Sequence, residues 1–319
     1  MHEAPTVSVL LVSYNTRHLL ADCLGALRQA AARVPTQLIV VENASRDGSR
    51  EALEREHPDV ELIVNETNVG FGRANNQALE RARGRYVLLL NTDAFVEPDT
   101  LERTVAFMDA HADVGILGVR LTGRDGALQP SCRYFPNPLN TFVARAGLPR
   151  AGGALRMVDD LAWPHDAVRD CDWVPGCYYL VRRRVVVEAG LFDPRFFLYM
   201  EEVDHCRRVK ALGWRVVYFP DARVVHLGGE SAKADGEVTT HGLQSAPLQV
   251  ESELLYYRKT YGLAGVGAHL ALTTLGDAIL ATKHVLRGRP LAALPSFAAH
   301  TRLALTLAQR TGLGARPTR

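Results

Sequence analysis

The sequence has few of the features that mark secreted, membrane-spanning or zinc-stabilised proteins. It contains five cysteines, an odd number without zinc-type spacing, so we expect no disulfide framework and a reducing, cytoplasmic setting. No basic segment followed by an apolar one opens the chain, so we expect no signal peptide. No run of 18 uninterrupted apolar residues occurs, so a membrane-spanning helix is not expected.

What is present describes a globular chain with an uneven charge. The 319 residues are 47% hydrophobic and 23% charged, enough for one large α/β domain with an appendage or for two domains. The net charge of +2 hides an asymmetry, because residues 264–319 hold seven of the 37 Lys and Arg but only one of the 35 acids, Asp277. Only one aromatic side chain, Phe297, is interleaved among these basic residues, so no nucleic-acid partner is expected.

Strand-like and helix-like segments alternate through the first part of the chain. Short links join them, which is typical of a doubly wound, mainly parallel sheet and predicts an α/β fold. We expect strands over residues 7–13, 37–41, 60–64, 86–90 and 115–121, and helices over 16–32, from 49, 71–82 and 99–110.

The alternation of strands and helices stops after Gly126. Residues 131–170, rich in Pro, Gly and Arg, predict a loop-rich segment near the site, and regular structure is expected again at 177–182, 215–219 and 222–226. The polar stretch 229–249 predicts a mobile lid, and a helical region begins near Leu254. We expect a catalytic domain over residues 1–250 and a helical, basic region over 251–319.

The most informative segment is the apolar run YVLLL at residues 86–90, followed by Asn91, Thr92 and Asp93. It predicts a buried parallel strand that presents Asp93 at the sheet edge where ligands of open α/β sheets bind. An acid there is costly unless it is paired or bound to a metal. A carboxylate oxygen suits Mg²⁺ or Mn²⁺ held against a diphosphate.

Other polar groups follow the neighbouring strands. Glu42 ends the second strand and is interpreted either as a contact to a base or ribose or as a solvated loop residue. Gly70 and Gly72 permit a tight turn into a helix N-terminus, which favours an anion. The alternative is an ordinary structural loop before the helix, where glycines are equally common. For Ser45, Asp47 and Gly48 a structural turn that caps the next helix is the favoured interpretation.

A second acidic cluster, Glu201, Glu202 and Asp204, follows aromatic and apolar residues. Such surroundings raise carboxyl pKa values, as a general base requires, whereas the alternative is an acid-rich first helical turn. His226 ends a strand before a Gly-rich loop and is interpreted as a metal ligand or phosphate contact, or as a structural histidine.

In combination these motifs resemble the family 2 glycosyltransferases of the nucleotide-diphospho-sugar transferase (GT-A) fold, and most of all their rhamnosyltransferase-type branch. The resemblance spans residues 6–231. It rests on segments at residues 9–15 (VLLVSYN), 40–49 (VVENASRDGS), 68–76 (NVGFGRANN), 88–93 (LLLNTD), 190–194 (GLFDP), 197–204 (FLYMEEVD) and 225–226 (VH).

The resemblance implies an inverting, metal-dependent transfer of a sugar, rhamnose in this branch. The donor is a nucleotide-diphospho-sugar, and the acceptor is a hydroxyl of a glycan or polyprenyl-linked glycan in cell-wall or surface polysaccharide synthesis. It implies Glu202 as the base, with Glu201 or Asp204 as alternatives, and Asp93 and His226 as ligands of Mg²⁺ or Mn²⁺. Trp173 and Gly176 would lie on the acceptor side. The implied donor nucleotide site comprises Ser13, Tyr14, Asn15, Glu42, Asn43, Asn68, Gly70, Phe71, Gly72, Asn75, Asn91 and Thr92.

Glu42 and Glu202 depart from the family, which more often has Asp at both places, and Asn91 replaces the first acid of an Asp-x-Asp motif. A nucleotidyltransferase is disfavoured because residues 13–17 lack a Gly-rich loop, and a non-catalytic binding module on the same fold remains the alternative. The Ala- and Leu-rich stretch 263–306 predicts either helices lying on the inner face of the cell membrane or a helical pair packed on the catalytic domain.

Overall fold

The structure, a computed structural model, describes residues 4–148, 155–228, 247–288 and 294–319. The chain divides into two compact units. The first comprises Met1–Arg133, Leu161–Pro194 and Glu201–Val238, and the second Tyr134–Asp160, Arg195–Met200 and Thr239–Arg319. Most of the lid expected at 229–249 lies outside the described residues, and residues 247–249 already belong to a helix.

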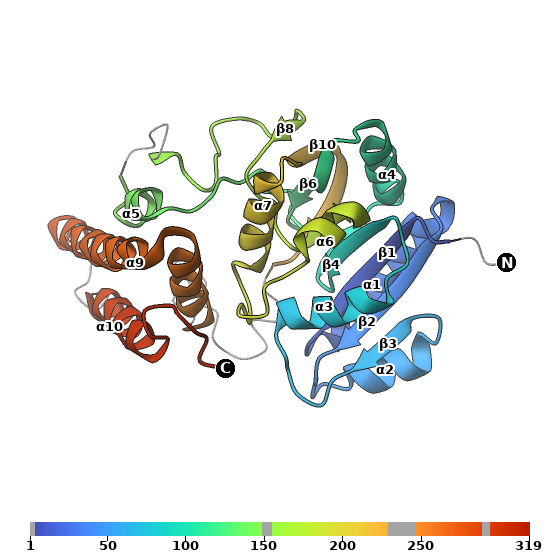
Figure 1. The fold of residues 1–319 in the computed structure, drawn as a ribbon, viewed down its shortest axis with the longest axis horizontal. Coiled ribbons are helices and arrows are strands. Elements are labelled where there is room, and N and C mark those ends of the chain that lie inside the picture. The colour runs from blue at the N-terminus through green and yellow to red at the C-terminus, as the bar shows by residue number, and fades with distance from the viewer. Residues whose placement is uncertain (1–3, 149–154, 229–246, 289–293) are drawn as a thin grey trace. The chain divides into compact units, whose positions relative to one another are not determined.

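The first unit is built on a sheet whose strands run in the order β3-β2-β1-β4-β9-β6-β10-β5, with β7 paired to β6 and β8 to β10 (Figure 1). The described strands are β1 (Val7–Ser13), β2 (Thr36–Glu42), β3 (Glu61–Val64), β4 (Tyr86–Asn91), β5 (Ala94–Val96), β6 (Val114–Thr122), β7 (Leu128–Gln129), β8 (Arg169–Asp170), β9 (Tyr178–Arg182) and β10 (Arg215–His226).

The sheet is mixed. The strands β3, β2, β1 and β4 are parallel, as the alternation of strands and helices predicts. By contrast, β9 lies antiparallel between β4 and β6, and β5 is antiparallel to β10. The two segments of regular structure expected at 215–219 and 222–226 form the single strand β10, whose pairing with β6 shifts register between Phe219 and Arg223. Pro220 lies at this irregularity, where a missing backbone donor is tolerated.

Helices cover both faces of the sheet, as in a doubly wound fold. In the first unit these are α1 (Arg17–Ala30) with the 3₁₀ turn η1 (Ala31–Arg33), α2 (Ser49–Glu56), α3 (Phe71–Arg81), α4 (Thr100–Ala110), α6 (Arg183–Ala189) and α7 (Glu201–Ala211). Leu11 of β1 packs in one core with Leu20 and Leu24 of α1. Because side chains alternate along a strand, Leu10 points to the opposite face of β1.

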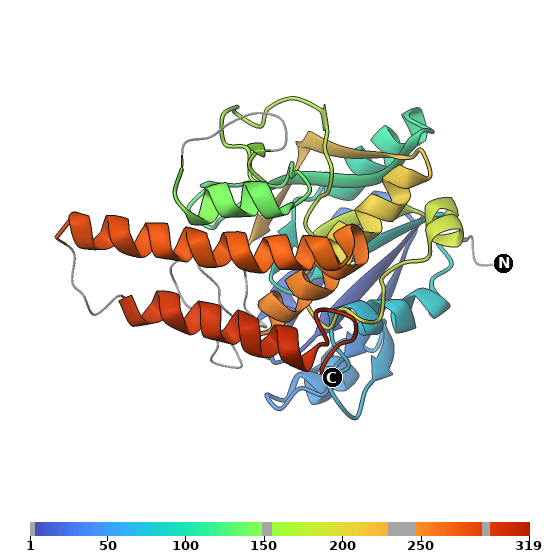
Figure 2. The ribbon, with the colours of Figure 1, turned by 60° about the vertical axis from the view of Figure 1, so that its left-hand side comes forward.

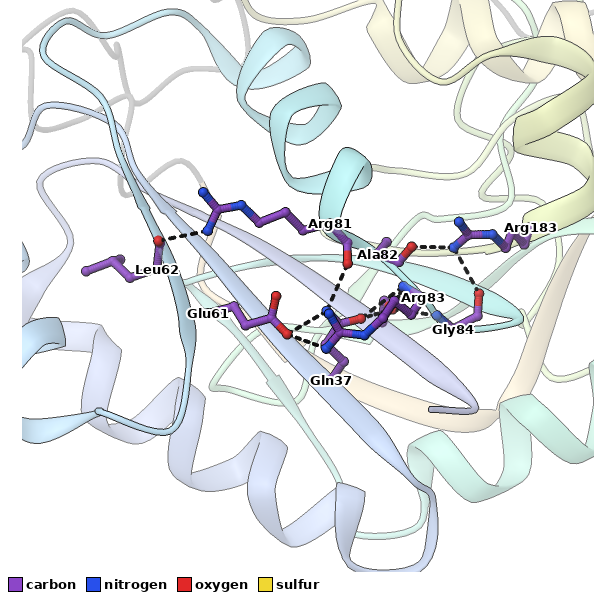
Figure 3. A network of polar contacts seen from close by, with 9 residues as sticks. Gln37, Glu61, Leu62, Arg81, Ala82, Arg83, Gly84 and Arg183 are labelled. Atoms are coloured by element: carbon purple, nitrogen blue, oxygen red, sulfur yellow. Dashed lines mark hydrogen bonds and ion pairs between the residues drawn. The ribbon is translucent and has the colours of Figure 1, made fainter. Parts of the chain in front are cut away.

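A polar network at the amino ends of the strands fixes the turn between α3 and β4 (Figure 3). Gln37 Nε2 donates to Glu61 Oε1 at 2.7 Å and to the Arg81 carbonyl at 2.9 Å. The backbone N–H of Arg83 donates to Gln37 Oε1 at 3.0 Å. A Cβ on Gly84 would lie 2.5 Å from the backbone nitrogen of Ser8, so this close approach of two backbones requires glycine. The network lies at the end of the sheet opposite the carboxyl edge.

The second unit contains α5 (Pro138–Arg145), α9 (Pro247–Leu286) and α10 (Leu294–Arg310). Figure 2 shows α9 between α5 and α10, and both helices contact it. Helix α9 is kinked at Gly262, whose φ of 67° is left-handed and interrupts the helix. By length and composition α9 is apolar enough to cross a membrane, with 33% of its most apolar window buried.

The expected loop over residues 131–170 is wrong at α5. Asn137 caps this helix by accepting hydrogen bonds from the backbone N–H groups of Leu139 and Asn140, and the Asn140 side chain accepts one from the Asn137 backbone. Pro138 occupies the first helical turn, where its fixed φ is favourable. These short-range signals mark a helix start in a segment whose composition resembles a loop.

Candidate active site

The carboxyl edge of the sheet carries polar residues at the ends of four strands. Ser13 at the end of β1 pairs with Glu42 at the end of β2, and Val12 pairs with Asn91 at the end of β4. At the far side of the sheet His226 ends β10 directly opposite Ala94 of β5. The structure therefore brings the predicted donor and metal residues of β1, β2, β4 and β10 to one edge.

The turn after β2 is built around the Glu42 carboxylate. It is buried, and it accepts the backbone N–H groups of Ser45 at 2.7 Å and Ala44 at 3.2 Å. The interpretation of Glu42 as a solvated loop residue is thus wrong. Asn15 and Ala44 both hold a left-handed backbone, with φ of 53° and 66°, a strained conformation that clusters at functional sites.

Asparagine side chains shape the loop that leads into α3. Asn43 Nδ2 donates to Asn68 Oδ1 at 2.8 Å, and the Asn68 oxygen also accepts the backbone N–H of Gly70 at 2.9 Å. Gly70 has a φ of 87°, whereas Gly72 is an ordinary helical residue, so the tight turn uses only one of the two predicted glycines. Buried Asn75 donates to the Phe71 carbonyl and stabilises the first turn of α3.

The start of α1 is tied to the end of β4. Buried Thr92 donates from Oγ1 to Thr16 Oγ1 at 3.0 Å, and the latter lies 3.4 Å from Ser13 Oγ. Tyr14, between Ser13 and Asn15, is half-buried. These hydroxyl contacts bring the predicted donor residues of β1 beside the residues that precede Asp93.

Asp93 faces His226. The carboxylate is 7% exposed and its Oδ1 lies 3.5 Å from His226 Nε2. The other ring nitrogen, Nδ1, lies 2.9 Å from Gln129 Oε1, and Gln129 Nε2 donates to the His226 carbonyl at 2.8 Å. His226 Nε2 is buried and has no hydrogen-bond partner within the described chain. Two potential metal ligands thus face each other at the carboxyl edge.

Thiols close to Asp93 do not extend this ligand set. Burial, reinforced by the Asp93 charge, raises the pKa of Cys23 and of Cys177 to about 12. Both therefore remain protonated at neutral pH and are poor metal ligands. All five cysteines are free and buried. Within the described part of the chain, no three His, Cys, Asp or Glu side chains come together as a metal site, so the candidate ligands are the pair Asp93 and His226.

The acidic cluster begins α7, as predicted, and its members differ in environment. Asp204 forms an ion pair with Arg208 Nε at 3.0 Å, and Arg208 also donates to the carbonyls of Ala189 and Leu191. Asp204 thus helps to hold the turn before α7. Glu201 is 3% exposed. Immediately before it the backbone is left-handed at Tyr199 and Met200, with φ of 71° and 68°, a second strained segment.

Glu202 lies next to the residues predicted for the acceptor side. Burial raises the pKa of its carboxyl above the ordinary 4.5, although the Arg133 guanidinium and the backbone N–H of Gly176 partly oppose the shift. A Cβ on Gly176 would lie 3.5 Å from the Phe71 ring, so this segment also borders the start of α3. The Arg133 guanidinium stacks 4.8 Å from the Trp173 ring. Gly176 is therefore a neighbour of Glu202, and the Arg133 guanidinium links Trp173 to the same carboxylate.

Sequence reasoning missed Gln129 and Arg133. Gln129 belongs to a two-residue strand, and Arg133 lies in the stretch expected to be loop. Neither residue belongs to a sequence motif. Each reaches the site through one contact that the sequence does not show, Gln129 with His226 and Arg133 with Trp173. Only the pairing of β7 with β6 and the bridge between Arg133 and Trp173 bring them to the site.

Comparison with known proteins points to one family. The model of the glycosyl transferase family 2 matches residues 8–153. An N-acetylglucosaminyl-diphospho-decaprenol L-rhamnosyltransferase of Mycobacterium tuberculosis is 27% identical over 251 residues, covering 71% of this chain and 78% of that protein. A poly(ribitol-phosphate) beta-N-acetylglucosaminyltransferase of Staphylococcus aureus is 28% identical over 131 residues, 40% of this chain and 23% of that protein.

Solved structures show the same fold. A mannosyltransferase of Pyrobaculum calidifontis, in complex with GDP-Man and Mn²⁺, superposes with a TM-score of 0.55 at 20% identity over 98% of this chain and 85% of that one. The shared fold is the GT-A fold, and the family match together with the curated relatives identifies the chain as a glycosyltransferase. Residues 8–153 match the family 2 glycosyltransferases, and over 251 residues the chain is similar to the mycobacterial rhamnosyltransferase.

Proposed function

We propose that this enzyme transfers a sugar, with inversion, from a nucleotide-diphospho-sugar to a hydroxyl of a lipid-linked glycan, in a reaction that depends on a divalent metal. The observation that carries the proposal is the placement of Asp93 and His226 at the edge where β1, β2 and β4 end. Rhamnose is the proposed sugar and a polyprenyl-diphosphate glycan the proposed acceptor, by analogy with the mycobacterial relative named above. Both belong to cell-wall polysaccharide synthesis.

The residues at the edge fit Mg²⁺ or Mn²⁺. Such ions are held by one or two protein ligands, together with substrate phosphates and water. Asp93 would supply a hard oxygen ligand and His226 a nitrogen, and the buried Nε2 atom of His226 has no competing hydrogen bond within the described residues. When bound, the metal would neutralise the charge that develops on the departing diphosphate.

Glu202 is the proposed base. Its carboxylate takes the proton of the acceptor hydroxyl, and the acceptor oxygen forms a bond to the anomeric carbon. The bond from that carbon to the nucleoside diphosphate breaks on the opposite side, so no covalent enzyme intermediate is needed. The raised pKa of Glu202 suits proton abstraction better than an ordinary carboxyl pKa does. Asp204, already paired with Arg208, is less available for this task.

The donor and acceptor groups follow from the same placement. For the nucleotide we propose the predicted residues at the ends of β1, β2 and β4 and at the start of α3, from Ser13 and Glu42 to Asn75. Gly176 adjoins Glu202 and Trp173 stacks on Arg133, and both would meet the acceptor. Catalysis is assigned to residues 1–250.

For residues 251–319 we propose contact with the anionic inner surface of the cell membrane. Helix α9 exposes Leu263 and Leu275, and its stretch 263–282 has no exposed ionisable side chain, because His269 and Asp277 are buried. Lys283 and exposed Arg287 follow directly. An exposed apolar face beside basic residues is typical of helices that lie on anionic lipid.

The test is release of nucleoside diphosphate from a panel of donors, with dTDP-rhamnose first and UDP- and GDP-sugars after it. N-acetylglucosaminyl-diphospho-polyprenol serves as acceptor, with Mg²⁺, Mn²⁺ or EDTA. We expect release with one donor that requires both metal and acceptor. Transfer that is equally fast in EDTA would contradict the metal requirement, and transfer to free sugars alone would contradict the lipid-linked acceptor.

A further inference from the structure

The β7 strand brings a glutamine side chain to the end of β10. Its amide makes two hydrogen bonds to one residue, accepting at Oε1 from His226 Nδ1 at 2.9 Å and donating from Nε2 to the His226 carbonyl at 2.8 Å. The second bond fixes the orientation of the amide, because a backbone carbonyl can only accept. Gln129 Oε1 must therefore be the atom that faces the imidazole.

This orientation selects one tautomer of His226. An amide oxygen has no proton to give, so the proton between it and the ring must belong to Nδ1. In a neutral imidazole the other nitrogen, Nε2, then carries a lone pair. That lone pair is on the atom 3.5 Å from Asp93 Oδ1, so two electron-rich atoms face each other. Adjacent ligands of one octahedral Mg²⁺ or Mn²⁺ ion are themselves roughly 3 Å apart.

We propose that Gln129 is a positioning residue that holds His226 as the Nδ1–H tautomer, so that Nε2 is free to bind the divalent cation. The inference rests on the proposed metal dependence and names a part of the site that the family motifs do not contain. An open cleft of about 600 Å³ is lined by His226 and Gln129, with His18, Arg124 and Asp125, so a ligand has room beside the imidazole. Partners of this kind around ligating histidines typically change metal affinity by about 10- to 100-fold.

Two substitutions separate positioning from simple support of the hairpin. Gln129→Met keeps the length of the side chain but removes both hydrogen bonds. Gln129→Glu also loses the bond to the His226 carbonyl, yet its carboxylate can still accept from Nδ1–H. If Gln129 acts only by anchoring β7 to β10, both variants should be impaired alike. If it selects the tautomer, Gln129→Glu should behave like the wild type.

The tautomer is read directly by long-range ¹H–¹⁵N correlation spectra of the metal-free protein, at a pH well above the ordinary imidazole pKa of about 6.5. The His226 signals are identified by their loss in His226→Asn. We expect Nδ1–H in the wild type and in Gln129→Glu, and a mixed or Nε2–H population in Gln129→Met. Binding of Mn²⁺ alone, followed by electron paramagnetic resonance of the free ion, should weaken about 10- to 100-fold in Gln129→Met only.

An Nε2–H tautomer in the wild type would overturn the proposal, as would equal losses of Mn²⁺ affinity in both variants. The proposed metal dependence can fail separately. A wild-type protein that shows the Nδ1–H tautomer but binds no Mn²⁺, alone or with the donor, would overturn the role of Nε2 as a ligand. The same result would remove metal dependence from the proposed function, whereas the spectra would still report what Gln129 does to His226.

Discussion

Asp204 is bound to Arg208, one turn further along α7, by a hydrogen bond of 3.0 Å between its carboxylate and the guanidinium Nε. Glu202, on the same first turn, has a buried Oε2 with no hydrogen-bond partner in the described residues. The difference assigns structure to one acid and leaves the other available for chemistry. Substituting Glu202 and Asp204 separately should therefore have different effects, one on activity and the other on stability.

Glu202→Gln should lower kcat about 10²- to 10⁴-fold, because an amide cannot take the acceptor proton. The melting temperature should change little, since the substitution is nearly isosteric. Asp204→Asn is the matched control on the same helical turn. It loses the charge that pairs with Arg208 and should lower the melting temperature more than kcat. A fully active Glu202→Gln enzyme would remove the base assignment and direct attention to Glu201.

The activity should fall on the acid side of neutrality. A base must be deprotonated to act, and burial raises the pKa of Glu202 above 4.5. The acid limb of kcat/KM, which reports the free enzyme, should therefore lie above pH 4.5, and activity should be present above that limb and lost below it. Measurement across pH 4 to 9 with saturating metal checks this, with Asp204→Asn expected to keep the limb. An acid limb below 4.5 would contradict Glu202 as the group that titrates.

Asp93→Ala should remove most of the response to Mg²⁺ or Mn²⁺ and lower kcat/KM by about 10³-fold, as expected when several kcal/mol of transition-state charge stabilisation are lost. The readouts are transfer as a function of metal concentration and binding of Mn²⁺. Asp99→Ala is the matched control, because it removes a carboxylate that forms a surface ion pair with Arg103. Metal-dependent activity that survives in Asp93→Ala would show that the ligand lies elsewhere.

Much of the first unit follows from the periodicity of its sequence. Buried apolar strands alternate with amphipathic helices, so β1 to β4 and α1 to α4 could be predicted to within a few residues. The placement of Asp93 beyond β4 and His226 at the end of β10 followed from where those strands stop. Their meeting was implied only by the family resemblance. The residues alone could not predict it, because it depends on the antiparallel pairing of β5 with β10, which places Ala94 opposite His226.

The parts that escaped prediction depend on side chains distant in sequence. The orientation of β9 is set by its neighbours β4 and β6 and not by its own pattern of residues. The proposed role of Gln129 depends on its two hydrogen bonds to His226, which the sequence does not reveal. Helix α5, by contrast, was predictable, since Asn137 and Pro138 form a recognisable helix start within a stretch of loop-like composition.

His205 should make the first unit sensitive to acid. Burial, with the Arg208 charge beside it, lowers the pKa of this histidine to about 3. As the pH falls below the ordinary 6.5, the unfolded chain takes up a proton that the folded one does not, so stability is fully present above 6.5 and is lost progressively towards 3. The slope for one such group approaches about 1.4 kcal/mol per pH unit.

In His205→Gln this contribution is absent, so the free energy of unfolding should depend less steeply on pH between 6.5 and 4. At neutral pH the variant should be less stable by about 1–3 kcal/mol, because the hydrogen bond between Tyr179 and His205 is lost in a buried site. Urea unfolding at a series of pH values measures both quantities. A slope equal to that of the wild type would assign the acid sensitivity to other groups.

Membrane contact should depend on the exposed apolar face of α9 and on anionic lipid. Leu275 and Leu286 are 49% and 81% exposed, so replacing both by Glu should leave the fold of the second unit intact. Each leucine that enters the interface contributes about 1.5–3 kcal/mol, so the double variant should lose binding to vesicles at least tenfold. Leu212→Glu changes a leucine that is 52% exposed in the first unit and serves as the matched control.

Flotation with vesicles of phosphatidylcholine, with and without phosphatidylglycerol, separates the apolar from the charged contribution. The wild type and Leu212→Glu should float with the anionic vesicles and much less with neutral ones, because basic residues near the surface add about 1 kcal/mol each only when the lipid is negative. The α9 double variant should float with neither. If it floats as the wild type does, this face of α9 does not bind the membrane, and a helix pair that serves only the protein's own packing becomes the better account of residues 251–319.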